Sequence, residues 1–513
     1  MRDTLKGIRS AALVCAALLF AAVTFAGAAR AQNSSDAAAA TPQETPPPPA
    51  APRSVNVPKP VERTLKNGLR VVVIENHSTP LVAAQVLVKS GGEVDPANLS
   101  GLADMTAELL TKGTKTRTAP QIAQEIEALG GVIEANAGWD ASRATVNVLA
   151  SKTEPAMAVL ADVVRNPVFK DEEIERLRQQ YMDSLSIGMN SPGQLASWVA
   201  SRVVFGASPY GHPVSGTLES VPAIKREDVV ALHTQYYRPD NAVLVIGGDI
   251  KADAAFAVAE KLFGDWAAPA GERKIMGGSL GLSPNTSPQT KQRVVVVDMP
   301  GAGQAAVLFA RRGIARTDPD FYTGVVANSV LSGYSGRLNQ EIRIKRGLSY
   351  GARASLDTRR AVGPFVASAQ TKNQSGAEVA SLLLGEMTRL SGEAVSETEL
   401  TPRKAVVIGN FGRTLETTEG LVAQIASLAL YGLSLDEINR YIANVQAVTP
   451  AQIQKFAGSR LAVGDANIVI VGDAKDFIEP LRKQFPDVEV IKRDELDLNS
   501  ATLRKTPSGS AKQ

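Results

Sequence analysis

The chain has 513 residues, of which 44% are hydrophobic and 21% are charged, and its formal net charge is +3. A single hydrophobic core stops growing near ~250–300 residues, so two or more domains are expected. No basic run is interleaved with aromatic residues, and the sequence therefore offers no footprint for a nucleic-acid partner.

The first 31 residues have the layout of a cleavable secretory signal. An apolar run, residues 11–28, ends before the small-residue site Ala29-Arg30-Ala31. Three basic residues come before the run: Arg2, Lys6 and Arg9. We expect a mature chain that starts at Gln32 and is exported, to the periplasm. The single cysteine, Cys15, would leave with the signal, so the mature chain would need no disulfide.

Residues 32–60 are rich in Ala and Pro, which predicts a disordered tether. No later run approaches ~18 uninterrupted apolar residues, so no membrane span is expected after signal cleavage. From Val61 onward, short β-branched runs alternate with long amphipathic segments. This pattern predicts mixed α and β layers, an α+β fold.

The first folded half shows clear start and stop signals. Two strands, "LKNGLRVVVIE" and "LVAAQVLVKSG", are followed by a helix with an N-cap at Thr118 and a capping-box partner at Gln121. A long charged helix is predicted over Asp171–Met189, closed before Pro192. "NAVLVIGGD" is then a buried strand, followed by a helix that runs to Phe263.

The second half repeats this order. "ANIVIVGDAKDFIEPLRKQF" mirrors "NAVLVIGGDIKADAAFAVAEKLF", with Gly248-Asp249 matching Gly472-Asp473 at an offset of 224 residues. An offset this long indicates domain duplication rather than a solenoid. We expect one domain over 61–268, a linker over 269–290, a second domain over 291–492 and a tail over 493–513.

The helix "GLADMTAELLTKGT", Gly101 to Thr114, follows a strand and a Gly-Gly turn. With the duplicated αβ unit, it resembles the pitrilysin/insulinase family of zinc metallopeptidases, which includes the mitochondrial processing peptidases. The resemblance covers roughly Val61 to Ile491 and implies two homologous domains that form half of a clam shell. In active members this helix carries the inverted zinc motif His-x-x-Glu-His.

A gapless alignment on "GLA" and "KGT" places the first His of that motif on Asp104, the catalytic Glu on Ala107 and the second His on Glu108. The family's third ligand, a Glu on a later helix, falls near Ser184, with Asp183 the nearest acid. Ala107 can neither accept a proton nor orient water. We therefore expect a degenerate zinc site, no zinc or other cofactor on this chain, and no activity of the chain alone.

Two further interpretations of this helix face stay open. One is a solvated polar face with an ion pair from Glu108 to Lys112. The other is a site at Asp104 and Glu108 for calcium, magnesium or manganese, although such sites usually recruit six or more oxygen ligands.

The segment "RLNQEIRIKRGLSYGA" resembles a stretch of the family's C-terminal domain in which an Arg and a Tyr seven residues apart reach the substrate and the tetrahedral intermediate. Arg343 and Tyr350 have this spacing. A guanidinium and a phenol can hold a peptide carbonyl and stabilise oxyanion charge. The simpler alternative is a basic helix end followed by a strand tyrosine.

The resemblance implies a zinc-less subunit of an exported heterodimeric peptidase. This chain would supply Arg343, Tyr350 and half of the peptide chamber, and a homologous partner would supply the zinc and the base. The alternative function is a noncatalytic peptide-binding or structural assembly protein of the same fold.

Overall fold

The computed structural model describes residues 57–268 and 292–505. These residues belong to one compact unit. The predicted signal peptide, all but the last four residues of the predicted tether, the predicted linker and residues 506–513 lie outside the described residues. In the described part of the chain, none of the helices has the length and apolar character needed to cross a membrane.

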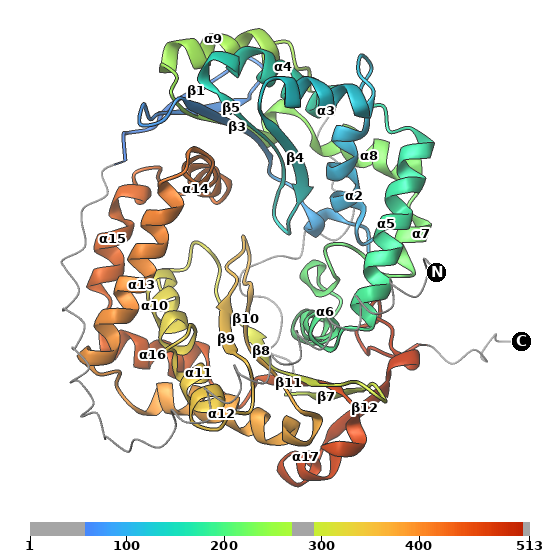
Figure 1. The fold of residues 1–513 in the computed structure, drawn as a ribbon, viewed down its shortest axis with the longest axis vertical. Coiled ribbons are helices and arrows are strands. Elements are labelled where there is room, and N and C mark those ends of the chain that lie inside the picture. Colours follow the sequence, from blue (N-terminus) through green and yellow to red (C-terminus); the bar gives the residue numbers. More distant parts are fainter. Residues whose placement is uncertain (1–56, 269–291, 506–513) are drawn as a thin grey trace, which may run out of the picture. The chain divides into compact units, whose positions relative to one another are not determined.

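The first half forms a mixed six-stranded sheet in the order β1-β2-β6-β3-β5-β4 (Figure 1). Strands β2 and β6 are parallel, and the other neighbours are antiparallel. The strands are β1 (Val61–Thr64), β2 (Arg70–Glu75), β3 (Leu81–Val88), β4 (Val132–Ala137), β5 (Ser142–Leu149) and β6 (Ala242–Gly248). The helices are α2 (Leu102–Leu109), α3 (Ala119–Ala128), α4 (Thr153–Arg165), α5 (Asp171–Met189), α6 (Pro192–Phe205), α7 (Ser220–Ala223), α8 (Arg226–Tyr236) and α9 (Ala252–Phe263).

The second half forms another six-stranded sheet, in the order β12-β7-β11-β8-β10-β9. Its strands are β7 (Val294–Asp298), β8 (Ala305–Arg312), β9 (Ala352–Leu356), β10 (Pro364–Thr371), β11 (Asn467–Gly472) and β12 (Val488–Lys492). Its helices are α10 (Phe321–Leu331), α11 (Arg337–Asn339), α12 (Gly376–Gly392), α13 (Glu397–Leu415), α14 (Thr418–Leu430), α15 (Glu437–Ala447), α16 (Pro450–Arg460) and α17 (Ile478–Gln484).

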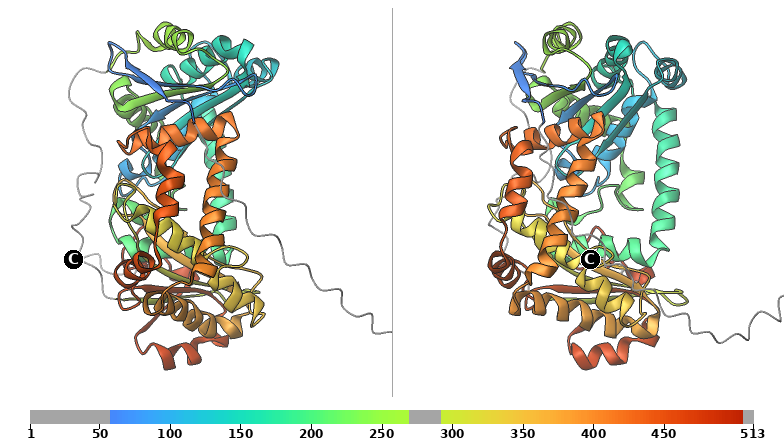
Figure 2. Two further views of the ribbon diagram at one scale, coloured as in Figure 1. Left: turned by 90° about the vertical axis from the view of Figure 1, so that its left-hand side faces the viewer. Right: turned by 60° about the vertical axis from the view of Figure 1, so that its left-hand side comes forward.

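The two halves share one topology, which confirms the predicted duplication. The order β2-β6-β3-β5-β4 in the first sheet corresponds to β7-β11-β8-β10-β9 in the second. Gly248 pairs with Glu75 at the end of β6, and Gly472 pairs with Asp298 at the end of β11. The long helices α5 and α13 also correspond, since each has 19 residues and precedes the next helix by only a short turn (Figure 2).

The predicted helix signals are confirmed where the structure describes them. Thr118 caps α3, and its side chain and that of Gln121 form a capping box. Helix α5 spans Asp171–Met189, as predicted. The first turn of α5 carries three acidic residues, which favour the positive end of the helix dipole.

The central strands of each sheet, such as β6 and β11, are buried on both faces, which explains why they read as continuous apolar runs. In β2, Val71 and Val73 face the helices of their own half, whereas Val72 and Ile74 pack with α14 of the second half. Residues of β7, β8 and β11 pack in the same way with α6 of the first half. The two halves therefore exchange helices α6 and α14.

One glycine shows how closely an exchanged helix approaches. A Cβ at Gly247 in β6 would lie 2.7 Å from Val422 of α14 and 2.9 Å from Ile74 of β2. These distances are shorter than ordinary carbon contacts, so a side chain at this position would force Val422 and Ile74 to shift.

Packed structure extends beyond two predicted boundaries. Val57 is buried, and its N–H donates to Asn439 Oδ1 at 2.9 Å. Leu496, Leu498 and Leu503 are buried in the core that contains α6. Residues before Val61 and after Lys492 therefore belong to the packed structure, because buried apolar side chains hold these segments against the rest of the chain.

Candidate functional site

Helix α2 begins at a tight turn that a buried carboxylate closes. Gly101 has a φ of 96°, a left-handed conformation that favours glycine. The Asp95 carboxylate accepts the N–H groups of Gly101 and Ala103, each at 2.8 Å. Asp95 thereby satisfies N–H groups at the start of α2 that have no partner within the helix.

The three positions that correspond to His-x-x-Glu-His have different surroundings. Ala107 is fully buried, at 0% exposure, and carries no group that could activate water. Asp104 and Glu108 are half-buried and lie one helical turn apart. Burial raises the pKa of both carboxyl groups, and the charge of Asp104 further raises the pKa of Glu108.

Tyr181 on α5 joins these two carboxylates. Its hydroxyl donates to Asp104 Oδ2 at 2.9 Å, and the N–H of Ala137 donates to Asp104 Oδ1 at 3.2 Å. The same hydroxyl interacts with Glu108. Burial, and then the two carboxylates, raise the pKa of the phenol, so it stays a donor. Asp104, Glu108 and Tyr181 are called the α2 cluster below.

Ser184 lies on the exposed face of α5, as does Asp183. Tyr181, three residues before Ser184, is the residue of α5 that meets Asp104. Sequence reasoning missed it, although a signal was present. The buried residues of α5 form a stripe at helical spacing, and Tyr181 is one of them: Ile174, Leu177, Tyr181, Leu185 and Gly188.

The donor atoms of the α2 cluster do not fit a zinc ion. Catalytic zinc is usually held by three protein ligands rich in imidazole, with a fourth position for water. The cluster offers two carboxylates and a phenol, and both oxygens of Asp104 already accept hydrogen bonds. Across residues 57–268 and 292–505, no group of three or more His, Cys, Asp or Glu side chains is arranged to hold a metal.

The segment that carries Arg343 and Tyr350 is anchored at its start. The Arg337 guanidinium donates to both carboxylate oxygens of Glu399, at 2.7 and 2.8 Å. The Asn339 amide donates to the backbone oxygen of Tyr334 at 2.6 Å. These bonds fix the chain just before Arg343.

Arg343 and Tyr350 themselves are available to a ligand. Arg343 lies in a π-helical turn, Gln340–Ile344, a conformation often found at functional sites. Its guanidinium stands over the Tyr334 ring, 5.3 Å from the ring centroid, and no carboxylate of the described residues pairs with it. Tyr350 is 90% exposed. No hydrogen bond or ion pair among the described residues links either side chain to the α2 cluster.

Tyr350 also lines a pocket of about 620 Å³, called the Tyr350 pocket below. The N-terminus of α6 forms one wall, and strands β8, β9 and β10 form the other. Its polar lining residues include Ser191, Gln194, Gln304, Arg353 and Gln370. The pocket therefore combines residues from both halves of the chain.

A buried polar network links the Gly-Gly turn before α2 to the second half. Glu93 accepts the N–H of Gly91 at 2.8 Å and pairs with the Arg360 guanidinium at 3.0 Å. The backbone N–H of Arg360 donates to Asp140 Oδ2 at 2.7 Å, and the Tyr431 hydroxyl donates to the same oxygen at 3.3 Å. Arg360 is therefore the cation of a network that holds the halves together.

The burial of Glu93 leads us to expect that the stability of the chain depends on pH in an unusual way. Burial raises the pKa of its carboxyl group to about 7, above the ordinary value near 4.5. Between about pH 4.5 and pH 7, the Glu93 carboxyl group keeps its proton in the native chain and loses it in the unfolded chain. The free energy of unfolding therefore receives its full contribution from protonated Glu93 below about pH 4.5, and this contribution is lost as the pH rises through 7. Chemical denaturation of the wild type and of Glu93→Gln, at pH 5 and pH 8, measures this contribution.

We expect the stability of the wild type relative to Glu93→Gln to fall by about 2–3 kcal/mol between these two pH values. Glu227→Gln is a matched control, because Glu227 is exposed in the first turn of α8. An unchanged difference across the pH range would show that Glu93 has an ordinary pKa.

Two regions of the sequence match known peptidase families. Residues 70–187 match the family described as insulinase (peptidase family M16), and residues 223–407 match the peptidase M16 inactive domain. The chain is similar to an uncharacterized zinc protease of Mycobacterium leprae, 26% identical over 397 residues, covering 77% of this chain and 87% of that protein. An uncharacterized zinc protease of Rickettsia bellii is 25% identical over 417 residues, covering 80% and 96%.

Solved structures show the same fold. A peptidase M16 inactive domain from Pseudomonas fluorescens superposes with a TM-score of 0.73 at 24% identity, covering 80% of this chain and 98% of that one. A protease from Helicobacter pylori also superposes with a TM-score of 0.73, at 21% identity, and the match covers 81% of this chain and 100% of that one. With its duplicated six-stranded sheets and its two matched regions, the chain belongs to the pitrilysin/insulinase family of peptidases, peptidase family M16.

Proposed function

We propose that this chain is the zinc-less subunit of an exported heterodimeric metallopeptidase, paired with a homologous zinc-bearing partner. The observation that carries the proposal is the α2 cluster. Where active relatives need two imidazoles and a general base, this chain has Asp104 bonded to Tyr181, and Ala107 is buried. Hydrolysis on the complex would therefore use the partner's metal and base.

Arg343 and Tyr350 support a contribution of this chain to the shared active site. Arg343 has no carboxylate partner among the described residues, and Tyr350 is almost fully exposed, so both can reach a molecule outside this chain. A charged N–H donor and a phenol O–H are the groups that stabilise a developing oxyanion. In the proposed complex they would hold the peptide carbonyl and stabilise the negative charge that develops on its oxygen, and the partner's metal and base would supply the activation of water.

Strand β4 supports the binding of an extended peptide substrate. It is the edge strand of the first sheet, and Val132 at its start is 61% exposed. An edge strand offers unpaired N–H and C=O groups that an extended peptide can bond by forming an additional strand. The N–H of Ala137, at the end of β4, is the one that bonds Asp104, so this edge lies beside the α2 cluster.

The proposal places the chain in the periplasm because of its first 31 residues, which have the layout of an export signal.

The relatives bear the name zinc protease, and one of the two matched regions bears the description inactive domain. The proposal assigns the missing zinc to a partner chain.

A second candidate function is peptide binding or assembly without cleavage. The Tyr350 pocket favours it, because that pocket is complete within this chain and needs no residue from a partner. The two candidates differ in one observable property, namely whether a zinc-bearing homologue that copurifies with the chain cleaves peptides only in its presence.

The first test of the proposed function is the metal content of the chain alone. After dialysis against a metal-free buffer, we expect far less than one zinc per chain and no cleavage of an unstructured peptide. Elemental analysis by mass spectrometry measures the zinc, and a fluorogenic peptide measures cleavage. Zinc near one equivalent that is lost with activity in Asp104→Ala would contradict the proposal.

A further inference from the structure

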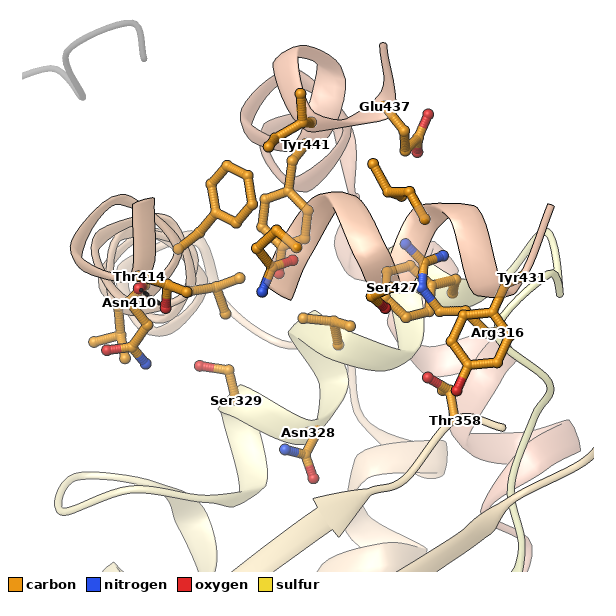
Figure 3. A pocket seen from close by; sticks show the side chains of 18 of the residues that line it. Arg316, Asn328, Ser329, Thr358, Asn410, Thr414, Ser427, Tyr431, Glu437 and Tyr441 are labelled. Carbon is orange, nitrogen blue, oxygen red and sulfur yellow. Dashed lines mark hydrogen bonds between the residues drawn. The ribbon is translucent and has the colours of Figure 1, made fainter. Parts of the chain in front are cut away.

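The second half contains a pocket of about 600 Å³ that the proposed function does not use (Figure 3). Its walls come from α10, α13, α14 and α15. By the shared topology, α10 corresponds to α2, and α13 corresponds to α5. The pocket therefore lies at the position in the second repeat that the α2 cluster occupies in the first. It is called the α10 pocket below.

Arg316 provides the α10 pocket with a cation. Its guanidinium lies over the Phe321 ring, 3.7 Å from the centroid, which fixes its plane. Burial lowers the pKa of this side chain, and the nearby Tyr322 and Glu437 only partly offset this effect, so an anion in direct contact with the guanidinium would relieve the cost of burying its charge. No carboxylate of the described residues is within salt-bridge distance of Arg316.

Glu437, the acidic residue that lines the α10 pocket, is already bonded elsewhere. It accepts the Tyr322 hydroxyl, accepts the Asn444 amide at 3.3 Å and pairs with Arg440 at 3.4 Å. The carboxylate charge of Glu437 is thus partly balanced by Tyr322, Asn444 and Arg440. The N–H groups of Arg316 are left for an acceptor that enters the pocket.

Asn328 provides a side-chain oxygen that accepts no hydrogen bond within the described residues. Its Oδ1 is buried and has no hydrogen-bond partner among the described residues, although the residue lines the α10 pocket (Figure 3). A buried carbonyl without a hydrogen bond is unfavourable, and a turn of the Asn328 side chain that brings Oδ1 to the pocket would let an N–H group of a ligand satisfy it. The α10 pocket therefore suits a ligand that has both an anionic group and an N–H donor.

One wall of the α10 pocket is apolar, whereas polar side chains, among them Asn410, Thr414 and Ser427, line other parts of it (Figure 3). The rings of Phe411 and Tyr441 are stacked, with their centroids 4.0 Å apart, and both residues line the α10 pocket. Three aliphatic side chains complete this wall: Val325, Leu428 and Ile438. Such a surface accepts an apolar or aromatic side chain.

We propose that the α10 pocket binds the C-terminal end of a peptide with an apolar last residue. The free carboxylate pairs with Arg316, a backbone N–H of the peptide donates to Asn328 Oδ1, and the last side chain packs on Phe411 and Tyr441. Peptide cleavage creates new C-terminal carboxylates, so the ligand class includes peptidase products. The site is complete within this chain and does not depend on a zinc-bearing partner.

The test uses the full chain alone and two probes, acetyl-Ala-Ala-Phe with a free carboxylate and the same peptide with a C-terminal amide. Titration calorimetry measures both affinities. We expect the free acid to bind at least about 10-fold more tightly than the amide, because hydrogen bonds between the Arg316 guanidinium and a charged carboxylate are stronger than those to a neutral amide. Arg316→Gln should remove this preference, and Arg316→Lys should retain part of it.

Asn328→Leu should weaken the acid and the amide alike, by about 5-fold or more. Arg482→Gln is the matched control, since it removes the same charge from an exposed arginine of α17. Thermal melting checks that each variant folds, and the comparison of acid with amide on the wild type stands without any variant. Equal binding of both probes, binding of neither, or a preference that survives Arg316→Gln would overturn the proposal. The assay has no cleavage step, so its failure is distinct from failure of the proposed function.

Discussion

In the proposed heterodimer, Arg343→Ala and Tyr350→Phe should each lower peptide turnover by about 10²–10³-fold, the usual cost of removing one donor to an oxyanion. The reason is that each substitution removes a hydrogen-bond donor that, under the proposed function, acts most strongly in the transition state. The effect should fall on kcat more than on KM. Steady-state kinetics on the reconstituted pair measures it, with the partner's zinc content and the complex's size determined on the same samples.

Arg346→Ala is the matched control for this experiment. Arg346 lies three residues after Arg343, but its guanidinium pairs with Glu341 at 2.8 Å and so is engaged within the chain. It should keep nearly full turnover. If the partner alone is fully active, or if both Arg343→Ala and Tyr350→Phe retain wild-type turnover, the shared-site proposal is wrong and the binding function takes its place.

Arg360→Ala should be the most destabilising single substitution among the exposed or half-exposed charges described above. It removes the cation beside Glu93, whose side chain is only 2% exposed, and it removes donors to the backbone oxygens of Lys89 and Asp140. Breaking a buried ion pair from one side costs about 3–5 kcal/mol, and the partial exposure of Arg360 reduces this to about 2–3 kcal/mol. Urea denaturation followed by circular dichroism measures the loss.

The double variant Arg360→Ala with Glu93→Gln tests the cause. If the cost comes from an uncompensated carboxylate, the second substitution should restore part of the stability, and the cost of Arg360→Ala should be larger at pH 8 than at pH 5. A cost that is the same at both pH values, with no recovery in the double variant, would assign the effect to lost packing alone.

Local order was predictable from the sequence wherever the signal is local. The capping box at Thr118 and Gln121 and the span Asp171–Met189 depend on residues within one or two helical turns. The duplication was also predictable, because β6 and β11 keep the same apolar run followed by Gly-Asp. These features need no knowledge of what lies on the other side of a sheet.

Features that depend on contacts between distant segments were not predicted. The exchange of α6 and α14 is invisible in the sequence, since an apolar stripe shows that a helix is buried but not against which sheet. The same limit applies to the candidate site. Alignment identified Asp104, Ala107 and Glu108, but the residue of α5 that contacts Asp104 is Tyr181 rather than Ser184 or Asp183, because the contact depends on how α5 is rotated against α2.

The exchange of α6 and α14 has a consequence for how the chain reaches its native state. The first sheet cannot cover its second face until α14 of the second half has been synthesised, whereas α6, which covers the second sheet, is made before that sheet. Contacts between such distant segments close large loops and slow folding. During synthesis the first repeat would expose the apolar residues of β2, β3 and β6 that later meet α14, so this sheet is the part of the nascent chain that most needs protection from aggregation.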